Sequence, residues 1–315
     1  TVALSGGELA VESLLLSADG NLSLNAGEGS FTYYGVGGRA IAPGAVAGNG
    51  GNGRGGSALL EMTGGTLVST LAPNGPAPRV VVSALAEGGR GGAVQSPTTN
   101  TGATSGSGGT GRGGNARIYY ESGLFDAVRI EVDATGLGGL TGNSGSSLAN
   151  AVGTGGAGGS GFGGTAAFEI ATTFDELNSA DDTRQITLRA DGTGIAGERG
   201  MVGGAGGNGT AGTASLDLFS SGTDTGNAYL VSPLLSAVGR GGAGGDSILD
   251  GNGGSGGFVR GGSIDLRVDG DGTQLTVFVD NLSARGFGGT GGSGGDGSAI
   301  VPVAGNGGNG GEGAG

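Results

Sequence analysis

The chain of 315 residues contains no cysteine, histidine, tryptophan or lysine. Without cysteine it forms no disulfide and supports no thiolate chemistry. Without histidine and lysine, the usual catalytic bases and nucleophiles reduce to carboxylates and to the hydroxyls of Ser, Thr and Tyr. The composition therefore predicts a protein that is not an enzyme and that needs no cofactor.

Positive charge is also scarce, because 14 arginines stand against 27 acidic residues and leave a net charge of −13. Nucleic acid and anionic membrane surfaces both favour basic partners, so the balance argues against either. The sequence has no apolar run of about 18 residues, which predicts no membrane insertion, and it opens at Thr1 without a signal peptide. We expect a segment of a longer array.

Glycine is abundant, at 84 residues, and aromatic residues make up only 4%, so any hydrophobic core must be thin. Two small residues followed by a polar residue open an alternating apolar segment at intervals of about 50 residues, which is typical of solenoids. The predicted repeats start near residues 8, 57, 115, 165, 213 and 263. Their unbroken period favours one elongated repeat domain over residues 1–315.

Within each repeat the first strand alternates with period two, which predicts buried columns along a stack of parallel coils. The predicted columns are Leu9, Ala58, Ala116, Ala166, Ala214 and Ile264; Val11, Leu60, Ile118, Phe168, Leu216 and Leu266; and Ser13, Met62, Tyr120, Ile170, Leu218 and Val268. A second strand ends on an apolar-x-Ala pattern at Leu24/Ala26, Val82/Ala84, Val132/Ala134, Leu188/Ala190, Leu235/Ala237 and Leu282/Ala284. These patterns predict an all-β, parallel β-solenoid of about six repeats.

The glycine runs contain a three-residue repeat, Gly-Gly-x, as in 253–258, 288–296 and 307–312. A left-handed helix of the polyproline II type places every third side chain on one edge and leaves two edges bare. Such a helix has no internal hydrogen bonds, so its amides need neighbours, and stacked coils supply them about 4.8 Å apart. We therefore expect polyglycine helices packed on one side of the solenoid, with polar x residues facing solvent. The alternative is a flexible Gly/Ser linker in each repeat.

One outward position of the first strand is rich in carboxylates. It holds Glu12, Glu61, Tyr119, Glu169, Asp217 and Arg267. The main interpretation is a solvated polar face. The alternatives are calcium binding between coils by Glu12, Glu61, Glu169 and Asp217, and glycosidase chemistry by a carboxylate pair.

The opening Leu-Ser-Gly-Gly-Glu-Leu-Ala-Val-Glu-Ser-Leu-Leu-Leu-Ser-Ala-Asp-Gly (4–20), with its later Gly-Gly-x-strand copies, resembles the glycine-rich repeat regions of filamentous-haemagglutinin-like and autotransporter exoproteins of Gram-negative bacteria. The resemblance implies a secreted β-helical stalk or adhesin at the cell surface. The glycine runs are longer than those of a plain three-sided β-helix, and by themselves they resemble mycobacterial Gly-Gly-x proteins and phage tail-fibre tips.

The expected function is that of a passive, extracellular structural segment that gives reach and rigidity. Its expected partners are other copies or neighbouring repeats, and a glycan or cell-surface receptor. The competing class is a ligand-binding module for glycan, host receptor or ice, although no flat threonine-rich row that would suit ice is present. A polysaccharide-cleaving β-helix enzyme is the third class.

Overall fold

The structure is a computed structural model that describes residues 1–11, 13–19, 39–42, 44–69, 79–94, 102–142, 153–171, 185–219, 227–230, 233–247, 251–270, 273–277, 281–294 and 306–314. Within these residues the chain is all-β, as predicted, and contains no helix. Accordingly, they include no candidate for a membrane-spanning helix.

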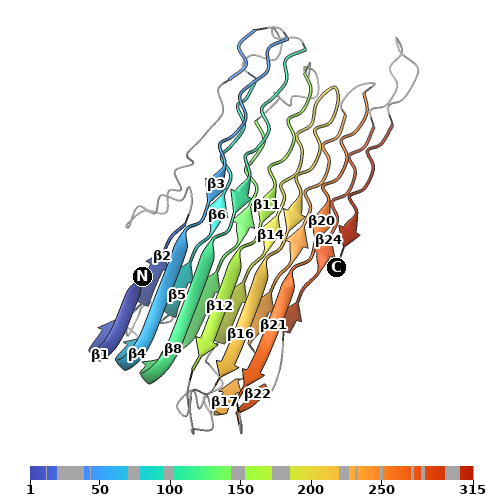
Figure 1. Cartoon of the computed structure of the whole chain (residues 1–315). Helices are drawn as coiled ribbons and strands as arrows, with labels where there is room; N and C mark the ends of the chain where they lie inside the picture. Colours follow the sequence, from blue (N-terminus) through green and yellow to red (C-terminus); the bar gives the residue numbers. More distant parts are fainter. Residues whose placement is uncertain are drawn as a thin grey trace.

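Two parallel sheets of long strands form the lower half of the molecule (Figure 1). Sheet 1 consists, in spatial order, of β1 (Val2–Val11), β4 (Ser57–Ser69), β8 (Asn115–Asp126), β12 (Thr165–Ile170), β16 (Thr213–Phe219) and β21 (Ser263–Asp269). Sheet 2 consists of β2 (Ser13–Ser17), β5 (Arg79–Ser83), β9 (Arg129–Asp133), β13 (Gln185–Arg189), β18 (Leu234–Ser236) and β23 (Asn281–Ser283).

Two parallel sheets of very short strands lie next to them. Sheet 3, which leads into sheet 1, contains β3 (Gly53–Arg54), β7 (Gly111–Arg112), β11 (Gly161–Phe162), β15 (Gly209–Thr210), β20 (Val259–Arg260) and β25 (Gly313–Ala314). Sheet 4, which follows sheet 2, contains β6 (Ala86–Glu87), β10 (Gly136–Leu137), β14 (Gly192–Thr193), β19 (Gly239–Arg240) and β24 (Gly286–Phe287). A separate pair joins β17 (Asn227–Leu230) to β22 (Gln274–Val277).

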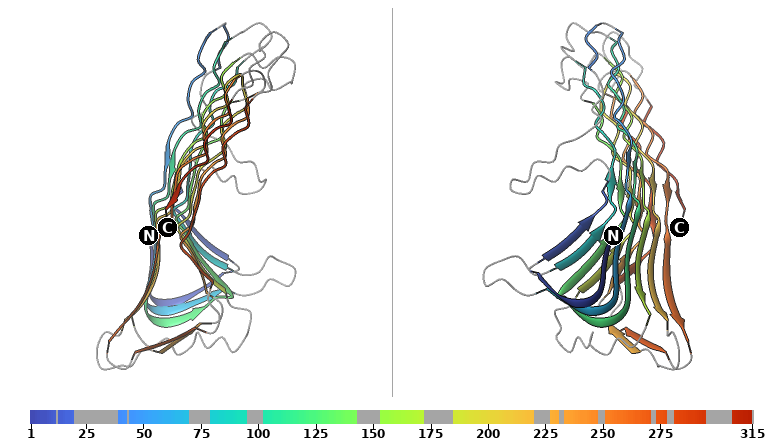
Figure 2. Two further views of the ribbon diagram at one scale, coloured as in Figure 1. Left: turned by 90° about the vertical axis from the view of Figure 1, so that its right-hand side faces the viewer. Right: turned by 60° about the vertical axis from the view of Figure 1, so that its left-hand side comes forward.

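The molecule has two walls: one is formed by sheets 3 and 1, and the other by sheets 2 and 4, each with the glycine runs that continue it. The hydrophobic core lies between sheets 1 and 2, where the two walls are furthest apart (Figure 2). Ile118, Phe168 and Leu216 are paired in register across β8, β12 and β16, and each is 0% exposed. The predicted columns are confirmed from Ala58, Leu60 and Met62 onward, because the inward residues of β4, β8, β12, β16 and β21 are paired in register. On the inner strands β8, β12 and β16, each of these side chains is covered by its counterparts on both neighbouring strands.

The predicted alignment of the first strand is wrong. Leu9 pairs with Leu67 and Val11 pairs with Ser69, so they do not join the columns of Ala58 and Leu60. Val2 lies in the column of Leu60 instead, and Leu4 in the column of Met62. Ser13, which was predicted beside Met62, pairs with Arg79 in sheet 2. Gly6-Gly7 therefore marks no strand entry.

These glycines belong to an irregularity in the middle of the long strands. Gly7, Gly65 and Gly123 all have positive φ, at 80°, 80° and 105°, and they stack on one another at the register shifts of β1, β4 and β8. Positive φ is accessible to glycine at little cost. A Gly-Gly pair thus occurs in two structural settings in this chain, at the entry to a strand and in the middle of one. The sequence motif alone does not distinguish them.

Sheet 2 confirms the second predicted pattern from Val82 onward, since Val82, Val132, Leu188, Leu235 and Leu282 are paired in register. In the first repeat, however, Leu16 lies beside Val82. Leu24 and Ala26, which were predicted for this place, lie outside the described residues. The error has the same origin as in β1, because it follows from counting the first repeat from Gly6-Gly7.

The glycine runs continue the strands lengthwise beyond sheets 3 and 4 and do not pack against one side of the long sheets, which corrects that prediction (Figures 1 and 2). Without side chains between them, the two walls come close enough to bond to each other directly. Gly108 N–H donates to Ala157 O of the next repeat in the same wall, at 3.0 Å, whereas Gly109 N–H donates to Gly89 O of the opposite wall, at 2.8 Å. The same pattern recurs at every third residue, as expected for three-residue helices.

A methyl group would not fit at these glycines. A Cβ added to Gly108 would lie 1.9 Å from Gly139 O, and one added to Gly109 would lie 2.0 Å from Gly51 O. The runs are therefore packed, which argues against flexible linkers.

The x residues of the triplets do more than face solvent. The backbone N–H of an x residue is left unused by the two glycine bonds. At several places the x residue of the preceding repeat is Asn, Asp or Ser, and its side-chain oxygen accepts from this N–H. Asn52 Oδ1 accepts from Thr110 N–H at 2.9 Å, and Asn208 Oδ1 accepts from Phe258 N–H at 2.9 Å. This ladder explains why Asn and Ser are common at the x position.

Candidate functional site

The carboxylate column predicted for sheet 1 forms as a row on its outer face. Glu61 pairs with Tyr119, Tyr119 with Glu169, Glu169 with Asp217, and Asp217 with Arg267. Glu12 lies outside the described residues, and Ala3 occupies the place beside Glu61. Because Tyr119 separates Glu61 from Glu169, the adjacent carboxylates in this row are Glu169 and Asp217.

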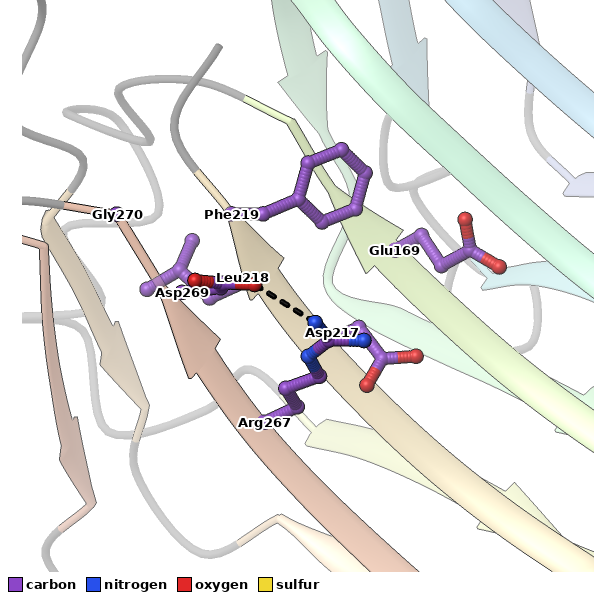
Figure 3. Close-up of a pocket in the computed structure, with 7 residues that line it drawn as sticks. All are labelled: Glu169, Asp217, Leu218, Phe219, Arg267, Asp269 and Gly270. Atoms are coloured by element: carbon purple, nitrogen blue, oxygen red, sulfur yellow. Dashed lines mark hydrogen bonds and ion pairs between the residues drawn. The ribbon is translucent and has the colours of Figure 1, made fainter.

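These two residues line an open hollow of about 600 Å³ together with Leu218, Phe219, Arg267, Asp269 and Gly270 (Figure 3). Figure 3 shows Glu169, Asp217 and Arg267 side by side on three neighbouring strands. The period-two alternation of β12, β16 and β21 places all three on the solvent side.

The positive charges in this region are already engaged by carboxylates. Arg267 donates to Asp269 at 2.7 Å, and Arg117 forms an ion pair with Glu169. Arg117 also lies over the ring of Tyr119, 5.5 Å from its centroid.

Burial and neighbouring negative charge act in the same direction on two groups here. The pKa of Asp217 is raised, first by burial and then by the charge of Glu169. The pKa of Tyr119 is likewise raised by burial and by the carboxylates of Glu121 and Glu169. Burial is therefore the main cause of both shifts, and neighbouring negative charge adds to it.

The arrangement offers limited chemistry. No group of three or more carboxylates, histidines or cysteines suited to a metal ion occurs within the described ranges, so Glu169 and Asp217 supply at most two protein ligands from this row. Hard cations such as calcium usually take six to eight oxygen ligands, many of them from the protein. Two neighbouring carboxylates also meet the minimum requirement of a glycosidase, but the hollow is open and the positions that line it recur along the stack.

A second outward row, which was not predicted from the sequence, lies on sheet 3. It is the arginine stripe, defined as Arg54, Arg112, Phe162, Thr210 and Arg260, which are paired in register on five successive strands. The recurring Gly-Arg-Gly-Gly at 53–56 and 111–114 and the Val-Arg-Gly-Gly at 259–262 are the signal that could have revealed it.

Comparison with known proteins adds no assignment, because no family model, curated protein or solved structure matches this chain.

Proposed function

We propose that the chain is a structural, non-catalytic segment of a secreted bacterial surface adhesin or extracellular fibre, to which it gives reach and rigidity. In this proposal residues 1–315 form one elongated domain. The domain is a parallel β-solenoid of about six repeats, extended lengthwise by polyglycine helices.

The observation that carries the proposal is the hydrogen bonding of the glycine runs in two directions. Gly158 N–H donates to Ala205 O along the stack at 2.9 Å, and Gly159 N–H donates to Gly139 O across the walls at 3.1 Å. A backbone that is bonded both along and across the stack resists bending and stretching without a disulfide or a large core. Rigidity of this kind is what a stalk needs.

The outer faces support a passive role. The outward positions of sheet 1 carry mixed polar and charged residues such as Asn115, Thr165 and Asp265. A net charge of −13 disfavours nonspecific association. The polar groups recur in rows along the stack, whereas a catalytic site requires different groups that converge on one point.

A tether experiment tests the structural role. The chain is placed between a surface anchor and a fluorescent tip, and a Gly/Ser linker of equal length serves as the control. We expect the chain to hold its extension under low force until a discrete unfolding step, while the linker stretches as a flexible coil. A force–extension curve that matches the linker would refute the proposal.

Two further measurements test the absence of catalysis and of a metal cofactor. We expect no release of reducing sugar from a panel of polysaccharides, and at most a small rise in unfolding temperature with calcium. A large calcium-dependent stabilisation that Glu169→Gln abolishes would contradict the passive role, as would turnover that the same substitution abolishes.

A further inference from the structure

We propose that the arginine stripe on the outer face of sheet 3 binds an acidic polysaccharide, that is, a chain of sugars of which some carry carboxylate groups. This inference goes beyond the structural role, because a rigid segment need not bind anything.

The first observation is a pair of like charges without a counter-charge among the residues that the structure describes. Arg54 and Arg112 are direct neighbours on β3 and β7, on strands about 4.8 Å apart, and both are exposed. Neither forms an ion pair with any residue that the structure describes. Like charges opposite each other weaken strand pairing, so a bound anion would relieve a cost that the free protein carries.

The second observation is an aromatic surface inside the stripe. Phe162 follows Arg112 in the row, and the Arg112 guanidinium lies 4.2 Å from the centroid of its ring. The guanidinium can donate two parallel hydrogen bonds to a carboxylate, and the half-exposed ring offers an apolar surface to the C–H face of a sugar.

The third observation is a hollow at each end of the stripe. One, of about 270 Å³, is lined by Asn52, Arg54, Thr110 and Arg112. The other, of about 420 Å³, is lined by Arg260 with Thr210, Thr213 and Ser263. Each hollow therefore combines an arginine with amide or hydroxyl groups that can bond to sugar hydroxyls.

The spacing of charge favours a polysaccharide over nucleic acid. The stripe has three cations on five strands, and the last two, Arg112 and Arg260, lie three strand spacings or about 14 Å apart. The carboxylate row of Glu169 and Asp217 lies on the adjoining sheet 1, and the protein carries a net charge of −13. A polymer with a phosphate on every unit would be repelled, whereas one with carboxylates on some of its sugars matches the sparse arginines.

The test measures binding of the full chain, by calorimetry at low salt, to oligogalacturonate in which about half of the carboxylates are methyl-esterified, called the acid form below. The matched ligand is fully methyl-esterified oligogalacturonate, which has the same sugars without the charge. We expect binding of the acid form only, and a loss of at least about tenfold in the triple variant Arg54→Ser, Arg112→Ser, Arg260→Ser.

The control variant is Arg90→Ser, Arg240→Ser, Arg285→Ser, which removes the same charge from three exposed arginines outside the stripe. We expect it to bind as the parent does. A separate Phe162→Ala variant keeps all arginines and should also weaken binding.

Three results would overturn the proposal: no binding of the acid form, equal loss in both triple variants, or tighter binding of single-stranded DNA than of the polysaccharide. None of these outcomes bears on the tether experiment, so failure of this site and failure of the structural role remain distinguishable.

Discussion

Asp246 accepts two hydrogen bonds from Ser293 of the next repeat, one from its backbone N–H at 2.9 Å and one from its hydroxyl at 2.8 Å, both to Oδ1. A related contact occurs at Asp191, whose Oδ1 accepts from the Ser236 hydroxyl at 2.6 Å and from the Val238 N–H at 2.7 Å. In both cases a single aspartate oxygen joins consecutive repeats. This contact makes the stability of the stack depend on pH.

The pKa of Asp246 is lowered from 3.8, chiefly by the Ser293 N–H. A lowered pKa contributes stability that is present above the ordinary value and is lost as pH falls through the folded value. We therefore expect Asp246→Asn to lower the melting temperature at pH 7. The difference in melting temperature between the variant and the parent should narrow below about pH 4. A gap that is constant from pH 7 to pH 3 would contradict this.

Asp133 should behave in the opposite way. Burial raises its pKa above 3.8, more strongly than its hydrogen bonds with Thr135 lower it. A raised pKa contributes stability at low pH that is lost as pH rises through the folded value. We expect the difference in melting temperature between Asp133→Asn and the parent to be more favourable to the variant at pH 7 than at pH 3. The variant avoids the cost of a buried charge at pH 7, and its side-chain oxygen still accepts from the Thr135 N–H. Thermal scans of both proteins at the two pH values measure this difference.

Phe168 tests the core. It is fully buried between Ile118 and Leu216, so Phe168→Ala should cost about 3 to 5 kcal/mol of unfolding free energy. Leu266 occupies the same column on the last strand of sheet 1 and is 42% exposed, so Leu266→Ala should cost only about 1 kcal/mol. If urea unfolding shows that Phe168→Ala and Leu266→Ala lose equal free energy of unfolding, the assignment of Phe168 to a buried column is contradicted.

Gly109 tests the packing of the glycine runs. Gly109→Ala should destabilise by about 1 to 3 kcal/mol, because the new methyl group would overlap Gly51 O. The neighbouring Thr110→Ala is the matched control, and since that side chain is partly exposed, we expect a change within about 0.5 kcal/mol. Equal tolerance at the two positions would mean that the walls do not touch.

Asn208 tests the side-chain ladder. Asn208→Ala should leave the Phe258 N–H to water and cost about 1 kcal/mol, and it should speed amide exchange at Phe258. Asn208→Asp keeps an acceptor oxygen and should preserve the protection. The idea fails if Phe258 exchanges at the same rate in both variants.

The sequence allowed the columns to be predicted wherever burial and strand period acted together, as at Leu60, Ile118 and Phe168. It failed at the first strand, because Gly6-Gly7 satisfies the same two-residue pattern as Gly55-Gly56 but lies at a mid-strand irregularity. Only the pairing of Val2 with Leu60 distinguishes the two uses, and pairing is a long-range property.

The outward row from Glu61 to Arg267 was likewise predictable, because alternation fixes which side chains share a face. The direction of the glycine runs and the acceptor role of Asn208 were not, since both depend on how close two walls approach. The arginine stripe was visible only as a recurring tetrapeptide, and its meaning depends on Arg54 and Arg112 becoming neighbours.

The glycine part of the walls also determines how stability should vary with temperature. Unfolding of an ordinary domain raises the heat capacity because it exposes apolar surface, whereas exposure of polar backbone lowers it. Pairs such as Gly109 and Gly89 bury backbone and almost no hydrocarbon. This part of the molecule should therefore have an unusually small heat capacity of unfolding, and its stability should fall little on cooling, when hydrophobic cores weaken.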